Sequence, residues 1–465
     1  MKVVTRFAPS PTGMIHIGSA RTALFNYLFA KRHGGEYKLR IEDTDTKRNV
    51  EGGVDAIING FDWLGIHHDG KIVFQSKNIK RHKEVASELL KSGKAYYCYT
   101  SQEELASLRE EAKKRGKVFK FKSPWREKKP SDTPKGISPV IRIKAPLKGE
   151  IKIDDAVLGA VTVPADALDD FIILRSDGTP TYMFAVVVDD HDMDITHIIR
   201  GNEHFNNAFR QKIIFDTMAW KTPKFCHIPL IHGPDGKKLS KRHGASSIME
   251  YKEMGYLPET LNNYLLRLGW SHGNDEIITM EQAVKWFNLE SLQKSPARFD
   301  FDKLNNINKH YIKLKDNTEL LQLAFASGLT QFSAEEKHKM LRAMNMIKDR
   351  AVRITDIKDA STTYISGCKQ KLDEKSQKII DSGGKEMLSE IYKSVLQYFN
   401  STSWNAEELK VRIKNFGDKK DWKMRDYTQA MRVAITFASV SPGGIFEIME
   451  ILGKDESLKR IENIL

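Results

Sequence analysis

The N-terminal segment constrains the fold most, because it alternates between two kinds of periodic pattern. Residues 3–8 have the composition of a strand that ends at two prolines, residues 19–33 carry apolar residues at helical spacing, and residues 37–41 read as a second strand. A strand, a helix and a strand at this spacing form a right-handed βαβ unit in a parallel sheet. Ligands of such sheets bind beyond the carboxyl ends of the strands, which is where the loop 9–19 is expected.

The loop ahead of the predicted helix has the composition of a phosphate-binding loop. Small residues let the backbone approach a phosphate closely, and a helix N-terminus offers free N–H groups and a positive dipole. Gly13, Gly18 and Ser19 fit this role, with Ser19 as the predicted helix cap. His16 is predicted to donate from its ring to a phosphate oxygen in the transition state, a contact worth about 1.5–3 kcal/mol. The alternative is a histidine that only completes the turn.

A second, basic motif stands more than two hundred residues downstream, where residues 238–242 read Lys-Leu-Ser-Lys-Arg. It follows Gly236, and Lys241, assisted by Lys238, is predicted to neutralise the charge that develops on a leaving pyrophosphate. A solvated charged turn is the alternative for this motif alone. Two such motifs in one chain indicate an enzyme that holds ATP by its phosphates from two sides and cleaves it between the α and β positions.

Charged residues follow the predicted strands at the edge where a substrate would bind. Glu42, Asp43 and Asp45 come after the second strand and suit an ammonium group or a ribose, with a helix cap or a surface turn as the alternative. Arg200 suits a carboxylate as a bidentate clamp, with a structural salt bridge as the alternative. The apolar run 184–188 is predicted to be another strand of the sheet, followed by an acidic loop.

The positive charge of the chain is concentrated in one segment. The 465 residues include 74 Lys and Arg against 61 Asp and Glu, a formal charge of +13. Residues 112–148 hold thirteen Lys and Arg against two Asp and Glu, whereas the last 155 residues hold 26 against 22. Because phosphates are attracted to such a basic stretch, the segment is predicted to face a nucleic acid. A chain of this length is also predicted to form about three to five domains.

The cysteines and the apolar segments indicate the expected compartment. Cys98, Cys226 and Cys368 form no CxxC pair, which is typical of a reducing compartment and argues against a disulfide-stapled or Cys-rich zinc protein. No run approaches 18 apolar residues, and the N-terminus leads directly into the first predicted strand without an apolar signal segment. The sequence therefore predicts a soluble, cytoplasmic protein with no membrane contact.

Both motifs resemble the signatures of one enzyme family. Residues 6–13 and 16–19 are similar to the first signature of the class I aminoacyl-tRNA synthetases in its glutamyl form, and residues 238–242 are similar to the second. The similarity to bacterial glutamate–tRNA ligases extends over essentially all 465 residues. It includes residues 41–45, 188–192 and 196–201.

The departures from the family pattern are few. Ser19 stands where histidine is common, and Leu239 stands where methionine or isoleucine is common, and both are tolerated in the family. Some bacterial members bind zinc in an inserted domain through closely spaced cysteines. Cys98 has no second cysteine near it, so we expect no structural zinc.

The resemblance implies an α/β Rossmann-type catalytic domain with the parallel sheet of class I synthetases, an α+β insertion and an all-α C-terminal anticodon-binding region. The catalytic domain is expected in two halves, residues 1–97 and 186–237, on either side of an acceptor-stem-binding insertion at 98–185. A signature-loop and stem-contact domain is expected at 238–310, and the helical anticodon-binding region at 311–465. A monomer is the default state of the family.

The resemblance also implies a reaction in two steps. ATP, carried with Mg²⁺, activates L-glutamate as glutamyl-adenylate, and the 3′-terminal adenosine of tRNA then accepts the glutamyl group. Family members often need bound tRNA before they activate glutamate, and the same is expected of this chain. The resemblance assigns roles by position. For glutamate, Ser10 and Glu42 are expected to hold the α-amino group, and Arg6, Tyr182 and Arg200 to share the two carboxylates. For ATP, the expected binding residues are His16, Gly18, Ser19 and Lys241 with Lys238 assisting, and Arg350 is expected to inspect the third anticodon base of tRNA.

Other assignments fit the chain less well. A glutaminyl-tRNA synthetase usually has a β-barrel anticodon region, whereas residues 311–465 are predicted to be helical, and a truncated paralogue that glutamylates a tRNA base would lack this region altogether. A nucleotidyltransferase would not need the second lysine motif, and an inactive tRNA-binding module would not need His16 and Lys241. The sequence leaves open whether tRNA-Glu, tRNA-Gln or both are charged, and charging of tRNA-Gln would feed an amidotransferase.

Overall fold

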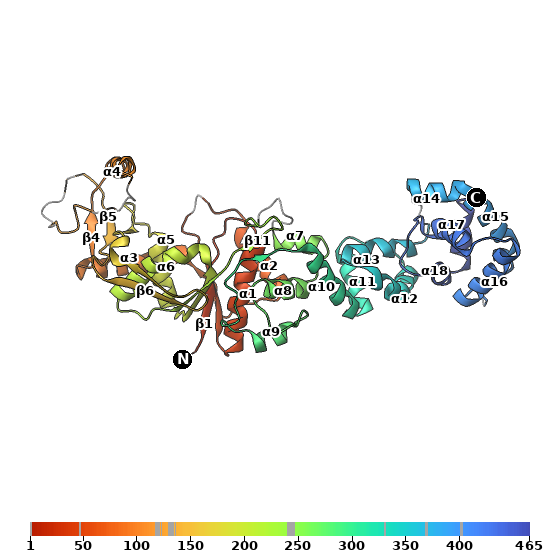
Figure 1. Cartoon of the computed structure of the whole chain (residues 1–465), viewed down its shortest axis with the longest axis horizontal. Coiled ribbons are helices and arrows are strands. Elements are labelled where there is room, and N and C mark those ends of the chain that lie inside the picture. Colours follow the sequence, from red (N-terminus) through yellow and green to blue (C-terminus); the bar gives the residue numbers. More distant parts are fainter. Residues whose placement is uncertain are drawn as a thin grey trace. The chain divides into compact units, whose positions relative to one another are not determined.

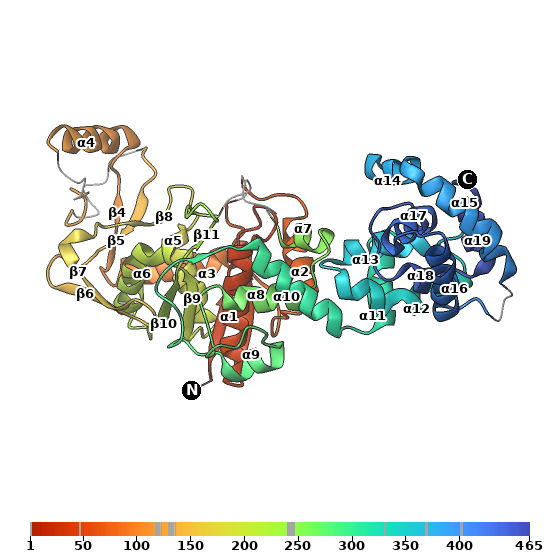
Figure 2. The same ribbon diagram turned by 45° about the vertical axis from the view of Figure 1, so that its right-hand side comes forward.

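The chain forms two compact units in the computed structural model. One consists of Met1–Glu250 with Leu261–Asp300, and the other of Tyr251–Thr260 with Phe301–Leu465. The first unit holds the strands and most of the predicted motifs, and the second is built from helices (Figures 1 and 2). The structure describes residues 2–45, 48–116, 121, 123–128, 134, 136–239, 247–329, 332–367, 371–399 and 403–465.

The first unit contains the parallel sheet that the sequence predicts. β1 (Val4–Phe7) pairs in parallel with β2 (Glu36–Ile41), and β2 pairs in parallel with β3 (Val73–Phe74). β9 (His197–Gly201) and β10 (Lys224–Ile228) form a second parallel pair. The backbone N–H of the residue before β9, Thr196, donates to the carbonyl of Val4 at 2.9 Å, so β9 lies next to β1.

The helix α1 (Ile17–Arg32) connects β1 to β2 and packs against β1. It begins at Ile17, and its N-cap is His16 rather than the predicted Ser19. The His16 Nδ1 accepts from the backbone N–H groups of Gly18 at 3.1 Å and Ser19 at 3.3 Å. The prediction was wrong because serine is a common cap residue and histidine is not, so composition favoured the later start.

Residues 184–188, predicted as a strand, belong to the helix α5 (Tyr182–Asp192). All five of these apolar side chains are buried, so no polar face gives the run a helical period. A short apolar run of this kind cannot be told from a buried strand by periodicity. Asp189 and Asp190 are consequently buried residues of a helix, not members of an acidic loop.

Antiparallel strands lie in the sequence between the two halves of the parallel sheet. β5 pairs with β4 and with β8, and β6 forms a hairpin with β7 and packs beside β10 (Figure 2). The helix that follows β4 begins with a capping box, in which the Ser101 hydroxyl accepts from the Glu104 backbone N–H at 3.1 Å. The elements are α3 (Ile79–Lys91), β4 (Ala95–Cys98), α4 (Gln102–Lys114), β5 (Val140–Ile143), β6 (Glu150–Asp155), β7 (Gly159–Pro164) and β8 (Ile172–Leu174).

One apolar core joins β1, α3, α5, α6 and β10, with Val4, Ala86, Val187, Ile214 and Phe225 among its buried members. Because α5, β1 and β10 share this close-packed core, the polar residues that these elements carry are held rigidly. The remaining elements up to residue 300 are α2 (Gly53–Leu64), α6 (Phe205–Thr217), β11 (Ile231–His232), α7 (Ile248–Glu253), α8 (Pro258–Arg267), α9 (Met280–Trp286) and β12 (Ala297–Arg298).

The second unit is helical over the residues that the structure describes, as predicted for 311–465. The helix Lys385–Ser394 is followed by a 3₁₀ turn at Leu396–Tyr398, and the last two helices are separated by Gly453 at φ +87°. None of the helices in the described ranges is long and apolar enough to cross a membrane. The helices are α10 (Phe301–Leu314), α11 (Asn317–Ala326), α12 (Ala334–Arg350), α13 (Ile354–Ser361), α14 (Glu374–Ile379), α15 (Lys385–Ser394), α16 (Ala406–Lys419), α17 (Met424–Thr436), α18 (Ile445–Leu452) and α19 (Lys454–Glu462).

Candidate active site

The ring of His16 has a fixed hydrogen-bonding pattern at the start of α1. Because Nδ1 accepts from the Gly18 and Ser19 backbone N–H groups, a neutral ring carries its proton on Nε2, which lies 3.0 Å from the Ser19 hydroxyl oxygen. Desolvation and the positive charge of Lys238 lower the pKa of His16, and Glu203 opposes them. His16 is therefore a neutral donor near pH 7, with its proton on Nε2.

Gly18 leaves room for this ring, because a Cβ there would lie only 3.2 Å from the ring carbon Cε1 of His16. The structure thus brings together the predicted phosphate-binding residues His16, Gly18 and Ser19, but it does not leave the backbone N–H groups free for a phosphate as the sequence predicts. The Gly18 and Ser19 N–H groups are used by the histidine, so the Nε2–H of His16 and the Ser19 hydroxyl are donors that this loop offers to a phosphate.

The first residues of the second motif are anchored to a short strand. Lys238 forms an antiparallel bridge with His232, and the Leu239 backbone N–H donates to the Ile231 carbonyl at 3.0 Å. The Lys238 side chain is exposed, and its charge acts on the pKa of His16. Lys241 lies outside the described residues, so its predicted role stays a prediction.

Asp190 of α5 lies between two buried arginines, Arg6 at the end of β1 and Arg40 of β2. Asp190 accepts from Arg40 Nη1 at 2.6 Å and from Arg6 Nε at 3.1 Å. The other Arg40 terminal nitrogen donates to Glu42 at 3.2 Å. Burial alone would raise the pKa of Asp190, but Arg40 and Arg6 outweigh it and hold that pKa below its usual range. The network therefore fixes the position of Arg6, a predicted substrate-binding residue.

Arg200, near the end of β9, has no carboxylate partner among the described residues. Its Nε donates to His227 Nε2 at 3.0 Å and its Nη2 to the His204 carbonyl at 3.3 Å, while Nη1 is buried and makes no hydrogen bond within the described part of the chain. Burial lowers the pKa of Arg200. Since a buried cation is costly without an anion, this geometry suits a substrate carboxylate better than the alternative of a structural salt bridge.

Tyr182, the first residue of α5, lies among the same charged groups. Burial raises the pKa of its hydroxyl, and Glu42, Arg200 and Arg6 are its charged neighbours. Its ring centroid is 6.3 Å from that of His204. Tyr182 is therefore a neutral donor within the arginine cluster, and the structure brings it together with three other predicted substrate-binding residues.

Glu42 directly follows β2 and is tied to the loop after β1. Its backbone N–H donates to the Pro9 carbonyl at 2.9 Å, which brings the exposed Ser10 close to the Glu42 backbone. Burial raises the pKa of Glu42, and Arg40 and Arg6 oppose this rise. A carboxylate in this position would gain a compensating charge from a substrate ammonium group.

Two further acidic residues serve the fold. Asp43 accepts from the Ser76 backbone N–H at 2.8 Å and from the Ser76 hydroxyl at 2.6 Å, so its carboxylate is used to hold the segment after β3. Asp189 accepts from Gln75 and His82, both at 2.9 Å. These pairs join the segment after β3 to β2 and α5.

Nothing in the sequence singles out Arg40, Asp190 or His227 individually. The strand alternates as Glu-Tyr-Lys-Leu-Arg-Ile, which puts Arg40 on the same face as Glu36 and Lys38, so the pattern indicates a polar, solvent-facing side for Arg40 and not a buried partner. The partner, Asp190, was assigned to a loop, and the error in α5 therefore concealed the pair.

Arg350 ends α12 in the second unit and is exposed. Its Nη1 donates to the Ser441 carbonyl at 2.9 Å, and Arg432 donates to the nearby Gly443 carbonyl at 3.0 Å. The two positive charges act on one another, since Arg350 helps to lower the pKa of Arg432 after the larger effect of burial. The predicted contact of Arg350 with an anticodon base stays a prediction.

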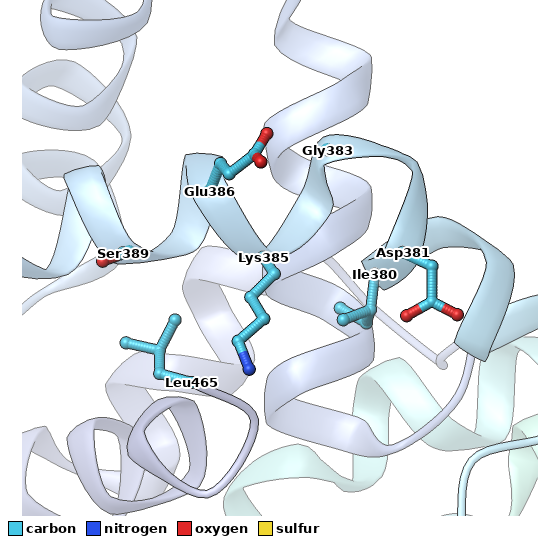
Figure 3. Close-up of a pocket in the computed structure, with 7 residues that line it drawn as sticks. All are labelled: Ile380, Asp381, Gly383, Lys385, Glu386, Ser389 and Leu465. Atoms are coloured by element: carbon cyan, nitrogen blue, oxygen red, sulfur yellow. The ribbon is translucent and has the colours of Figure 1, made fainter.

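A pocket of about 470 Å³ lies in the second unit, with Lys385 pointing toward Leu465 (Figure 3). The side chains that line the pocket carry both positive and negative charges, so the pocket does not favour binding of a phosphate or of a cation. The described residues hold no group of three or more His, Cys, Asp or Glu side chains that could bind a metal. The pocket is lined by Ile380, Asp381, Gly383, Lys385, Glu386, Ser389 and Leu465.

Comparisons with known proteins identify the family of the chain. The family described as tRNA synthetases class I (E and Q), catalytic domain, matches residues 2–306, and an anticodon binding domain matches residues 318–465. A glutamate–tRNA ligase 1 of Bartonella bacilliformis is 49% identical over 99% of this chain and 98% of its own length. A glutamate–tRNA ligase 2 of Paramagnetospirillum magneticum is 47% identical over 100% and 98%.

A solved structure of a glutamate tRNA ligase is also similar to this chain over its whole length. The crystal structure of a glutamate tRNA ligase from Elizabethkingia meningosepticum, in complex with its amino acid, has a TM-score of 0.86 and 31% identity, and covers 100% of this chain and 99% of that one. These matches confirm the predicted class I synthetase fold with a helical anticodon-binding region. The chain belongs to the class I tRNA synthetases of the glutamate and glutamine type.

Proposed function

We propose that this chain is a glutamate–tRNA ligase, which activates L-glutamate with ATP and transfers it to the 3′-terminal adenosine of tRNA. The observation that carries this proposal is the buried Arg200, whose Nη1 has no partner among the described residues and whose charged neighbours include Arg6 and Glu42. A substrate with two carboxylates and one ammonium group matches two arginines and one carboxylate. Relatives 46–49% identical over nearly the whole chain are named glutamate–tRNA ligases.

The substrate-binding residues divide by charge. Arg6, Tyr182 and Arg200 share the two carboxylates of glutamate, and Ser10 and Glu42 hold its α-amino group. The buried partners of Arg6 and Arg200 restrict their movement, so that little conformational entropy is lost when glutamate binds. Neutral glutamine would leave one cation of this cluster without a counter-charge, which favours glutamate.

The ATP-binding residues act on charge that moves onto pyrophosphate. An oxygen of the glutamate α-carboxylate attacks the α-phosphorus, the bond to the bridging oxygen breaks, and the leaving pyrophosphate carries the electron pair away. The Nε2–H of His16 donates to a phosphate oxygen, and Lys238 and Lys241 add positive charge. Mg²⁺, when bound with ATP, would neutralise part of the charge of its phosphates. The protein forms no covalent bond to the substrate and contributes positioning and charge stabilisation.

The tRNA completes the reaction. The 2′-hydroxyl of its terminal adenosine attacks the acyl carbonyl of glutamyl-adenylate, and AMP leaves. The basic stretch 112–148 faces the phosphates of the tRNA, and Arg350 contacts the anticodon.

The first test measures charging of two purified transcripts, tRNA-Glu and tRNA-Gln, with labelled glutamate. We expect tRNA-Glu to be charged. Additional charging of tRNA-Gln would make the enzyme non-discriminating, and charging of tRNA-Gln alone would make it a source of substrate for an amidotransferase. If neither transcript is charged in the presence of ATP and Mg²⁺, the proposed function is wrong.

A second test examines Arg200 directly. Arg200→Lys retains the positive charge but loses the planar pair of N–H donors, so we expect the KM for glutamate to rise about tenfold. The KM for ATP should stay unchanged, because His16 and Lys238 bind the nucleotide. Arg210→Lys is the matched control, since Arg210 forms a half-exposed ion pair with Asp169 at 3.0 Å. An unchanged KM for glutamate in Arg200→Lys would contradict the assignment.

A further inference from the structure

His227 of β10 lies between Asp155 of β6 and Arg200 of β9. Its Nδ1 is 2.6 Å from Asp155 Oδ2, and its Nε2 accepts from Arg200 Nε at 3.0 Å. His227 is fully buried, and Asp155 and Arg200 are nearly so, at 2% and 6% exposure. β6 packs beside β10 (Figure 2), and β10 pairs with β9, where His227 and Arg200 are register partners. The chain of contacts therefore runs from the β6–β7 hairpin to the arginine that we assign to glutamate.

The two neighbours determine the state of the imidazole. A guanidinium can only donate, so Nε2 of His227 must carry a lone pair, and an ionised Asp155 can only accept, so Nδ1 must carry the proton. His227 is therefore neutral and has one tautomer. Its backbone N–H also donates to Asp155 Oδ2 at 3.1 Å, which holds the carboxylate against the ring from a second side.

We propose that His227 and Asp155 are positioning residues for glutamate binding, an inference that rests on the proposed function. Asp155 holds the proton on Nδ1, His227 accepts from Nε of Arg200, and this contact orients the guanidinium so that Nη1 is presented to a substrate carboxylate. Protonation of His227 would place an N–H group against the Arg200 N–H and a second positive charge beside it. The guanidinium would then turn, and glutamate would bind more weakly.

The groups around His227 determine the pH at which its ring becomes protonated. The charged and titratable groups around it are Asp155 from β6, Arg200 from β9 and the ring of His204, while the rings of Phe205 and Phe225 lie 5.1 and 5.9 Å from it. Burial, the largest effect, lowers the pKa of His227, and Arg200 and His204 lower it further against the opposing Asp155. The KM for glutamate should therefore rise only below about pH 6.5, the ordinary pKa of histidine.

Four variants of the full-length chain separate this role from packing. His227→Phe removes the acceptor but keeps a flat ring, whereas His227→Gln offers an amide oxygen to Arg200 and cannot titrate. Asp155→Asn places an NH₂ group among donors whichever way the amide is turned, because Asp155 also accepts from the Val157 backbone N–H at 2.9 Å. His197→Gln is the control, since His197 on β9 also has a lowered pKa, about 4, but hydrogen-bonds Thr196.

The experiment measures KM and kcat for tRNA charging between pH 5.5 and 8, with L-glutamate and ATP varied separately. We expect His227→Phe and Asp155→Asn to raise the KM for glutamate about tenfold at pH 7.5, with kcat and the KM for ATP within about twofold. His227→Gln should keep the wild-type KM at pH 7.5 and lose its rise at acid pH. His197→Gln should behave as the wild type.

Two results would overturn the inference. One is an unchanged KM for glutamate in folded His227→Phe, and the other is an acid rise in KM that persists in His227→Gln. If His227→Phe and Asp155→Asn do not fold, the comparison of wild type with His227→Gln across pH still decides. If the wild-type enzyme charges tRNA and either of these results is found, the positioning role is wrong but the proposed ligase function stands. A wild-type enzyme that charges no tRNA would contradict the proposed function and this inference with it.

Discussion

His16→Asn should slow formation of glutamyl-adenylate by about a hundred- to a thousandfold while leaving the fold intact. The two roles of His16 use different ring nitrogens: Nδ1 caps α1, and Nε2–H is the donor to phosphate. Asparagine is among the best helix caps, so its side-chain oxygen can replace Nδ1. It has no group that reaches the position of Nε2–H. The rate of ATP–pyrophosphate exchange in the presence of tRNA measures the loss.

His16→Ala is the companion variant, because it removes both roles. We expect the same loss of exchange together with about 1 kcal/mol lower stability from the missing cap. The KM for glutamate should stay within about threefold of wild type in both variants, since the arginine cluster is untouched. Wild-type exchange rates in His16→Asn would show that the ring only completes the turn.

Much of the catalytic architecture could be predicted from the sequence, because local rules decide it. The βαβ unit follows from strand and helix periods, and the positions of His16 and Gly18 follow from a loop at the carboxyl end of a strand. The helical second unit follows from amphipathic periods and capping residues, as at Ser333, where the sequence contains a capping box that the structure forms.

The rest could not be predicted, because it depends on contacts between distant residues. Asp190 and Arg40 are 150 positions apart, and nothing local indicates that they pair. The apolar run of α5 has no period, since the helix is buried on every side. Arg200 was predicted as a carboxylate clamp from the local sequence, and the resemblance added its role toward glutamate, but its neutral partner His227 was not predicted, because the tautomer of a histidine depends on what lies on both sides of its ring.

Asp190→Asn should lower the free energy of unfolding of the first unit by about 3–5 kcal/mol, the cost of removing one member of a buried ionic network. Asp190 is fully buried and receives hydrogen bonds from two buried arginines, Arg6 and Arg40. An amide there removes the negative charge and turns one of its acceptors into a donor. Hydrogen exchange of peptides from β1, β2 and α5 in increasing urea measures the change within this unit.

The matched control is Asp192→Asn, on the same helix. Asp192 pairs with Arg81 at 2.9 Å, but both side chains are more than one-third exposed, so its loss should cost less than about 1 kcal/mol.

The pH dependence of the stability difference between wild type and Asp190→Asn adds a second check. Because the arginines hold the pKa of Asp190 below its usual value of about 3.9, its contribution is complete above that pH and is lost as the pH falls through the lowered pKa. The difference between wild type and Asp190→Asn should therefore persist from pH 8 to about pH 4 and shrink below it. Equal stabilities of the two at pH 7 would mean that the buried arginines do not depend on this carboxylate.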